Sequence, residues 1–305
     1  MPTSQKRLRA YFYLLINTLC WGAAFIIVAP ALNHTSPFQF LFYRFALASL
    51  FIAPVLFYYL RKKQSWKHIW KIIGIELLGT VICLSLLYAG LARTTAIETS
   101  ILATTTPLFI IFASILFLRE RETRREWLGL TVSVAGILLI AALPLLNGEV
   151  GLSRISLVGN ILVLLANCAT ALYAIIIKSH YKKIPPFLAV AISFWLGAVV
   201  FGFLSLANSN FSLPLLISTI ATDWQQPAVV FASLYMAIFG SIIGLTAYIK
   251  GQNLIEASEA SVFYYLQPLV YLPLGVLILG EHISPYQIFG LAAILVGVWI
   301  SERRS

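Results

Sequence analysis

The sequence predicts an all-α membrane protein whose ten transmembrane helices form two inverted five-helix repeats. Three observations support this fold class. Of the 305 residues, 60% are apolar and 10% are charged, whereas soluble domains are about 45–50% apolar and about 25% charged. The apolar residues form ten long runs, and part of the first half of the chain recurs in the second. A chain this apolar can cover its excess apolar surface only with lipid.

Each run contains about 20 mostly apolar residues, the length that an α-helix needs to cross a bilayer. In lipid every backbone polar group must be satisfied within the segment, so the runs are expected to be helical. Turn signals such as Ser36-Pro37 and Pro185-Pro186 separate several of them. The longest intervening segment, 208–226, is expected to form an outer loop or a surface helix. The predicted spans are 11–32, 37–60, 70–91, 95–118, 126–145, 156–178, 186–207, 227–249, 259–279 and 284–301.

The basic residues are distributed unequally between the two sides of this arrangement. Of 21 Lys and Arg residues, 18 fall on the side that holds both termini, two (Arg93 and Arg154) fall on the other side, and Arg44 lies within span 2. Because cytoplasmic loops carry an excess of Lys and Arg, both termini are predicted to be cytoplasmic. We expect a multi-pass protein of the bacterial inner membrane. The net charge of +10 comes from clusters between apolar runs, so it indicates a lipid bilayer and no nucleic-acid partner.

An internal repeat divides the chain into residues 1–147 and 154–305. Because each half has five spans, an odd number, the second half enters the membrane from the opposite side. Such a fold can open to either side when its halves exchange conformations; a duplication kept only for packing is the alternative. A shift of 161 residues pairs, without a gap, Gly79 with Gly240, Gly90 with Gly251, Glu98 with Glu259, Pro107 with Pro268, Glu120 with Glu281, Gly129 with Gly290 and Gly136 with Gly297.

The repeated pattern is an apolar helix with a proline near its middle, a terminal glutamate and then a helix with spaced glycines. It reads Pro107-Leu108 … Glu120 … Gly129 … Gly136 and recurs as Pro268-Leu269 … Glu281 … Gly290 … Gly297. With Trp21-Gly22 and Arg44-Phe45, it resembles the drug/metabolite transporter superfamily, specifically its EamA-type ten-helix branch. The resemblance implies a central cavity and the export of small metabolites such as amino acids. Glu76 departs from it, since an apolar or small residue is expected there.

Three pairs of repeated residues are candidates for hinges and for fixed contacts between helices. Pro107 and Pro268 each remove a backbone donor, so each is either a hinge or a static kink. Glu98 and Glu259 lie in the first turns of spans 4 and 9, where an acid complements the helix dipole. The dipole disfavours Glu120 and Glu281 at the opposite ends of these spans, so we expect both to be helix-end anchors or gate contacts.

Two charged residues, Arg44 and Glu76, lie well inside predicted spans, away from the span ends. Arg44 either extends to the outer surface or binds a carboxylate that faces the cavity. Removing the Glu76 carboxylate from water favours its protonated form, so Glu76 is a candidate for proton coupling. An acid that reaches the interface or pairs with Lys71 is the alternative for Glu76.

The remaining candidates are polar or aromatic residues within spans, which suit a small amphipathic solute because they combine apolar contact with a few orienting hydrogen bonds. Packing or an interfacial aromatic belt would explain the same residues. With Arg44, the predicted cavity residues are Asn17, Trp21, Ser85, Tyr88, Asn167, Tyr173, Tyr248, Tyr265 and Gln267.

Other function classes find little support. Cys20, Cys83 and Cys168 are far apart, and no metal-binding spacing or catalytic motif is present, so we expect neither an enzyme nor a metal or other cofactor. A channel would need a filter loop or rings of charge, and a scaffold would need larger soluble parts. The sequence predicts a secondary transporter for a small molecule, with a channel-like facilitator or a membrane scaffold as the alternatives. It does not indicate an oligomeric state.

Overall fold

The structure is a computed structural model that describes residues 4–61, 66–118, 124–146, 150–180, 185–252, 254–255, 263 and 266–302. All regular secondary structure within these ranges is helical, as the sequence predicts. The first half contains α1 (Ser4–Gly22), α2 (Ala24–Val28), η1 (Ala31–Asn33), α3 (Pro37–Arg61), α4 (Trp66–Glu76), η2 (Leu77–Ile82), α5 (Cys83–Leu91), α6 (Ala96–Ala103), α7 (Thr106–Leu118) and α8 (Arg124–Leu146). The second half contains α9 (Val150–His180), α10 (Pro186–Asn208), α11 (Leu213–Asp223), α12 (Pro227–Tyr235), η4 (Met236–Ile243), α13 (Gly244–Gln252), α15 (Pro268–Leu279) and α16 (Pro285–Glu302).

Seven helical segments of the described chain are long and apolar enough to cross a membrane: Gln5–Asn33, Pro37–Arg61, Ile69–Leu91, Ala96–Ala113, Ser156–Ile176, Phe187–Asn208 and Pro227–Gln252. Each coincides with one of the predicted spans. The other three predicted spans correspond to shorter apolar stretches, Trp127–Ile140, Pro268–Leu279 and Pro285–Gly297. The total of ten therefore stays a prediction, while a multi-pass membrane protein is established.

The surface of the bundle is apolar, and polar side chains lie inside it. Leu277 is 80% exposed, Leu116 is 75% exposed and Val199 is 65% exposed. By contrast, the polar residues Asn17 and Glu76 are buried. Soluble proteins bury most such leucines and expose such acids, so this surface is suited to lipid.

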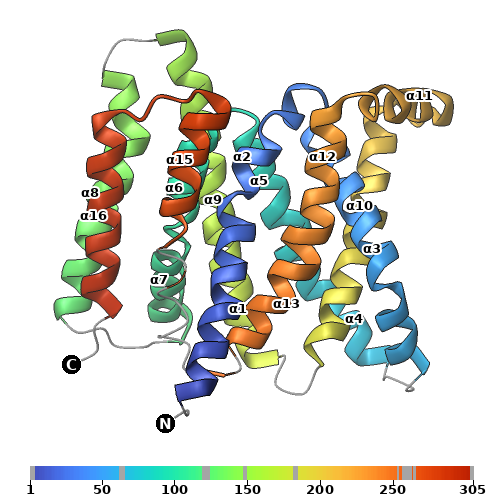
Figure 1. The fold of residues 1–305 in the computed structure, drawn as a ribbon, viewed down its shortest axis with the longest axis horizontal. Coiled ribbons are helices and arrows are strands. Elements are labelled where there is room, and N and C mark those ends of the chain that lie inside the picture. Colours follow the sequence, from blue (N-terminus) through green and yellow to red (C-terminus); the bar gives the residue numbers. More distant parts are fainter. Residues whose placement is uncertain are drawn as a thin grey trace.

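The helices pair in a way that is symmetric under the predicted repeat (Figure 1). The most extensive contacts join α8 to α16 and α3 to α10, which are span 5 with span 10 and span 2 with span 7. Next come α5 with α9 and α1 with α13. These join span 3 to span 6 and span 8 to span 1, so the repeat converts one pair into the other.

Glycines allow the backbones of α8 and α16 to approach closely. A Cβ at Gly136 would lie 2.6 Å from the Gly290 carbonyl oxygen, and a Cβ at Gly297 would overlap the Gly129 carbonyl oxygen. The shift of 161 residues converts the first of these contacts into the second. Small residues at helix crossings in membranes permit this approach.

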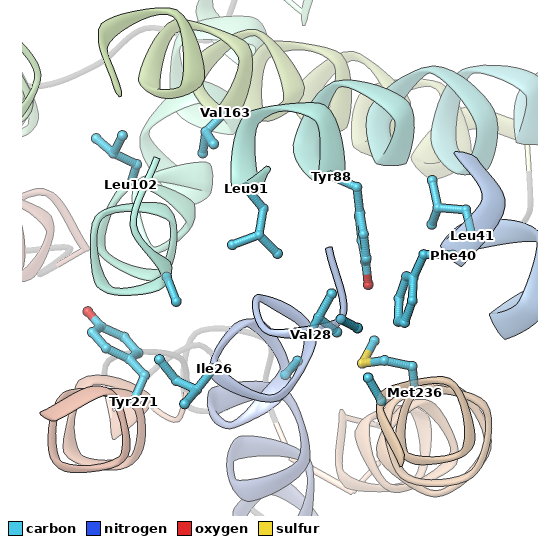
Figure 2. Packing of buried hydrophobic residues seen from close by; sticks show 14 of the residues in the cluster. Ile26, Val28, Phe40, Leu41, Tyr88, Leu91, Leu102, Val163, Met236 and Tyr271 are labelled. Atoms are coloured by element: carbon cyan, nitrogen blue, oxygen red, sulfur yellow. The ribbon is translucent and has the colours of Figure 1, made fainter. Parts of the chain in front are cut away.

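One hydrophobic core extends through both halves of the bundle. Figure 2 shows side chains from α2, such as Ile26 and Val28, beside Tyr271 from α15 and Met236 from η4. The rings of Phe40 and Tyr88 stack with their centroids 5.7 Å apart.

The segment predicted as an outer loop or surface helix contains α11, which lies across the ends of neighbouring helices (Figure 1). Asp223 at the end of α11 is buried, and it accepts hydrogen bonds from Thr35 Oγ1 at 2.5 Å and Tyr43 Oη at 2.8 Å. These bonds attach α11 to the start of α3.

Candidate functional site

Two π-helical segments, η2 and η4, lie at corresponding positions of the two halves. A shift of 161 residues places η2 on residues 238–243, which lie within η4. π-helical turns are rare and often occur at functional sites. They also misalign the regular backbone ladder, so the carbonyls of these segments need other partners. We therefore take the side chains around η2 and η4 as the candidate site.

Side chains from α1 satisfy carbonyls of η4 and its junction with α13. Trp21 Nε1 donates to the Gly240 carbonyl at 2.9 Å, and Asn17 Nδ2 donates to the Gly244 carbonyl at 3.1 Å. A Cβ at Gly244 would lie 2.9 Å from Trp21 Nε1. The two predicted cavity residues of α1 thus hold η4 against this helix.

Side chains from α9 and α10 contact η2 through ring packing and through a side-chain hydroxyl. The ring of Tyr173 packs over Gly79 so closely that a Cβ there would overlap it. Thr80 Oγ1 lies 2.6 Å from Ser193 Oγ and donates to Glu76 Oε2 at 2.9 Å. Because α9 and α10 are the counterparts of α1 and α3, the two π-helical segments have related surroundings.

One contact recurs in both halves with different chemistry. Arg44 Nε donates to Ser241 Oγ at 3.4 Å. In the alignment of the two halves that pairs Pro37 with Pro186, Arg44 pairs with Ser193. In the alignment with a shift of 161 residues, Thr80 pairs with Ser241. The contact between Ser193 and Thr80 is therefore the counterpart of the one between Arg44 and Ser241. The guanidinium occurs only in the first of these two contacts.

Arg44 contacts side chains inside the bundle, while its binding of a carboxylate stays a prediction. It lies about 10 Å along α3 from its outer end. Its Nη1 donates to the fully buried Tyr88 Oη at 2.8 Å, and its Cζ lies 5.1 Å from the ring centroid of Phe45. An arginine at mid-bilayer costs at least about 2.5–3.5 kcal/mol. Neutral hydroxyls and cation–π contacts offset only part of this cost.

Glu76 is also buried, with 3% of its surface exposed. Besides Thr80, it accepts a hydrogen bond from Tyr173 Oη at 2.8 Å. These donors come from its own span and from α9, so the carboxylate faces the bundle interior. Proton coupling through Glu76 stays a prediction.

The chain of predicted span 4 breaks just before Pro107, so that Pro107 lies in the first turn of α7. A proline is accommodated there because the first helical residues have no intrahelical acceptor for their N–H. Thr104, Thr105 and Thr106 donate to the carbonyls of residues 101, 102 and 103 at 2.6–2.8 Å. Asn167 from α9 stabilises this break, because its Nδ2 donates to the Leu102 carbonyl at 2.8 Å. Pro268 begins α15 in the same way.

Glu281 contacts the N-terminus of α6, at the end of the bundle opposite to the chain termini. Its Oε1 accepts from the Ala96 N–H at 2.8 Å, and its Oε2 accepts from the Ile97 N–H at 2.9 Å. A carboxylate disfavoured by the dipole of its own helix is thus stabilised by the positive end of another. The contact borders a cavity of about 350 Å³ that is also lined by Asn33, Leu91 and Thr94.

Glu98 lies in the first turn of α6, as predicted, and is buried. Its side chain accepts hydrogen bonds from Thr94 Oγ1, from Ser156 Oγ at 2.8 Å, from Asn160 Nδ2 at 3.2 Å and from Gln287 Nε2 at 3.4 Å. These donors are neutral and connect α6 with α9 and α16. Glu98 therefore fixes several helices as well as complementing the α6 dipole.

Other predicted residues lie farther from these contacts or outside the described chain. The ring of Tyr248 packs at a tilt against that of Trp21 with centroids 5.6 Å apart, and its Oη accepts from Gln252 Nε2 at 2.5 Å. Ser85 is half-buried in α5, and Gln267 is the half-buried cap residue of α15. Tyr265, Glu120 and Glu259 lie outside the described residues.

The sequence analysis did not single out the hydroxyls of Thr80 and Ser241 within the π-helical segments or that of Ser193 beside η2. Thr80 and Ser241 share a position in the repeat, and this pairing was the signal that could have identified them. Ser193 has no such signal, because its partner position holds Arg44.

The comparisons with known proteins cover nearly the whole chain. The profile of the EamA-like transporter family matches residues 8–142 and 157–302. An uncharacterized transporter of Archaeoglobus fulgidus is 25% identical over 97% of this chain and 100% of its own. Uncharacterized transporter YcxC of Bacillus subtilis is 25% identical over 95% of this chain and 91% of its own. A crystal structure with 16% identity and a TM-score of 0.58 covers 98% of this chain and 100% of its own, which shows the fold alone.

Proposed function

The chain belongs to the EamA-like transporter family, and we propose that it is a secondary transporter that moves a small amphipathic metabolite by alternating access. The family resemblance makes export across a bacterial inner membrane the expected direction. Ten spans in two antiparallel units, 1–147 and 154–305, with both termini cytoplasmic, form part of this proposal. Figure 1 supports it, because α1 begins and α16 ends on the same side of the bundle.

The observation that carries this proposal is the pair of π-helical segments held by related contacts. An inverted repeat can present one site to either side when its halves exchange conformations. The exchange requires that each half can adopt the packing of the other. Contacts of Arg44 with Ser241 and of Ser193 with Thr80 use the same positions in both halves, as such an exchange needs.

The helix breaks before Pro107 and Pro268 are the positions at which bending would concentrate. At Pro107 the threonine hydroxyls already satisfy carbonyls that a continuous helix would bond, so bending there loses few hydrogen bonds. Asn167 would set which bend is adopted, because its amide contacts both sides of the break. Glu281 would anchor a helix end in one conformation, and Glu120, its counterpart in the repeat, would do so in the other.

A transport assay tests the proposal. Purified protein in liposomes is screened with radiolabelled amino acids and other small metabolites, and uptake is measured with and without unlabelled solute inside. Saturable uptake accelerated by internal solute supports a carrier. Flux without saturation would instead indicate a channel-like facilitator. Absence of flux for every solute in a broad panel would favour a membrane scaffold.

Proton coupling through Glu76 is tested in the same liposomes with an imposed pH gradient. The wild type should accumulate solute in response to the gradient, whereas Glu76→Gln should catalyse counterflow without accumulation. Tyr173→Phe is the matched control, because it removes one hydrogen bond to Glu76 and leaves the carboxylate. Accumulation by Glu76→Gln equal to that of the wild type would exclude Glu76 as the coupling group.

A further inference from the structure

The guanidinium of Arg44 is only partly satisfied by its protein partners. It carries five N–H donors. One is directed at Tyr88 Oη and one, at 3.4 Å, at Ser241 Oγ. The other three have no hydrogen-bond partner within the described part of the chain. Both observed acceptors are neutral hydroxyls, so the described surroundings supply no compensating charge.

From this, and resting on the proposed carrier function, we infer that Arg44 binds a carboxylate of the transported solute, which makes the substrate a small monocarboxylate, either an amino acid or a simple organic acid. A carboxylate accepts two parallel N–H bonds from a guanidinium, and such charge-assisted pairs are the strongest hydrogen bonds available to arginine. The rings of Phe45 and Tyr88 lie 5.1 and 5.9 Å from the Arg44 Cζ. Both rings are almost completely buried, and their contacts hold the guanidinium in place.

The charge at the site favours a single carboxylate over a dianion. One guanidinium balances one negative charge, and a dianion such as a phosphate ester would leave a second charge in an apolar interior. In the corresponding contact of the other half, a neutral serine, Ser193, meets Thr80. That contact cannot balance the second charge, because Thr80 already donates to the acidic Glu76.

The rival explanation is that Arg44 only ties α3 to α5 and η4. The two explanations differ in what they predict for ligands that lack the carboxylate. A structural tie would affect every solute equally. A binding role predicts that Arg44 distinguishes an acid from its amide, and this ratio within one variant does not depend on how much protein folds.

The test is competition in the liposome assay. Each L-amino acid and several monocarboxylates compete for uptake, beside the carboxamide and the decarboxylated amine of each. In the wild type, acids should compete at least about tenfold more strongly than the matched amides. In Arg44→Gln this preference should fall to less than about threefold, and Arg44→Lys should retain part of it. Competition by acids that lack an amino group separates organic-acid from amino-acid substrates.

Each outcome bears on one claim. Saturable counterflow of neutral or cationic solutes, with no preference for carboxylates, would overturn the role of Arg44 and leave the carrier function standing. An unchanged preference in Arg44→Gln would do the same. Absence of counterflow for every solute tested would instead contradict the proposed function itself.

Discussion

Removing the Glu281 carboxylate should loosen the end of the bundle where α15 meets α6. In Glu281→Ala the N–H groups of Ala96 and Ile97 lose the oxygens that they contact at 2.8 and 2.9 Å. Hydrogen bonds to a charged acceptor contribute about 1.5–3 kcal/mol each. The favourable position at the helix N-terminus adds about 0.3–1 kcal/mol.

Water in the adjoining cavity can replace part of this stabilisation, so the net loss should be about 1–3 kcal/mol. That loss corresponds to a shift of about 5–150-fold in the equilibrium between the closed state, in which Glu281 contacts α6, and an open state without this contact. If the contact closes this end of the bundle, Glu281→Ala shifts the protein toward the open state. Glu281→Gln should fall between wild type and Glu281→Ala, because its amide oxygen can still accept one of the two bonds.

Thiol labelling measures this shift. Leu91 lines the cavity and is 2% exposed. In a protein whose three native cysteines are replaced by alanine, Leu91→Cys should react faster with an impermeant maleimide after Glu281→Ala, by about 5–150-fold. Arg93→Cys, at an exposed neighbouring position that does not line the cavity, reports the reactivity of the reagent itself. An unchanged rate at Leu91→Cys in folded protein would refute the idea that Glu281 closes this side.

Four further substitutions, of which Gly74→Ala is a control, test the packing of the helices by thermal unfolding in detergent. Gly297→Ala places a Cβ 2.7 Å from the Ser133 nitrogen and should lower the free energy of unfolding by about 1–3 kcal/mol. In the control Gly74→Ala, where nothing lies within 4 Å of the new Cβ, that free energy should be unchanged or raised by up to about 1 kcal/mol. Equal effects of the two substitutions would contradict the close approach of α8 and α16. Asn167→Ala removes the donor to the Leu102 carbonyl at the break before α7 and should lower the free energy of unfolding by about 1–3 kcal/mol. An unchanged melting temperature would argue against this role of Asn167. Glu98→Ala leaves several buried donors without an acceptor and should cost more than about 3 kcal/mol; a loss below about 1 kcal/mol would mean that water replaces the carboxylate.

The membrane-spanning character of the chain follows from the sequence because it depends on composition. Apolar runs of sufficient length have few alternatives to a helix in lipid. The repeat could also be seen, because glycines at close helix crossings, such as Gly136 and Gly297, tolerate no side chain and are kept in both halves.

The π-helical segments could not be predicted, because they depend on partners from distant spans. Nothing local in residues 77–82 specifies a π-helix, because the Tyr173 ring that packs over Gly79 and the Tyr173 hydroxyl that donates to Glu76 come from tertiary structure. Glu281 shows an intermediate case. Its position against its own helix dipole indicated an external partner, but only the fold identifies the N-terminus of α6 as that partner.

The central claim is that two related units lie antiparallel in the membrane, so that one site can face either side. Single cysteines at Ser153 and Ser4, each in a cysteine-free background, test it directly in intact cells and in inverted vesicles. The account predicts that an impermeant thiol reagent labels Ser153→Cys only from outside the cell and Ser4→Cys only from the cytoplasm. Labelling of both positions from the same side would make the two units parallel and contradict transport by alternating access.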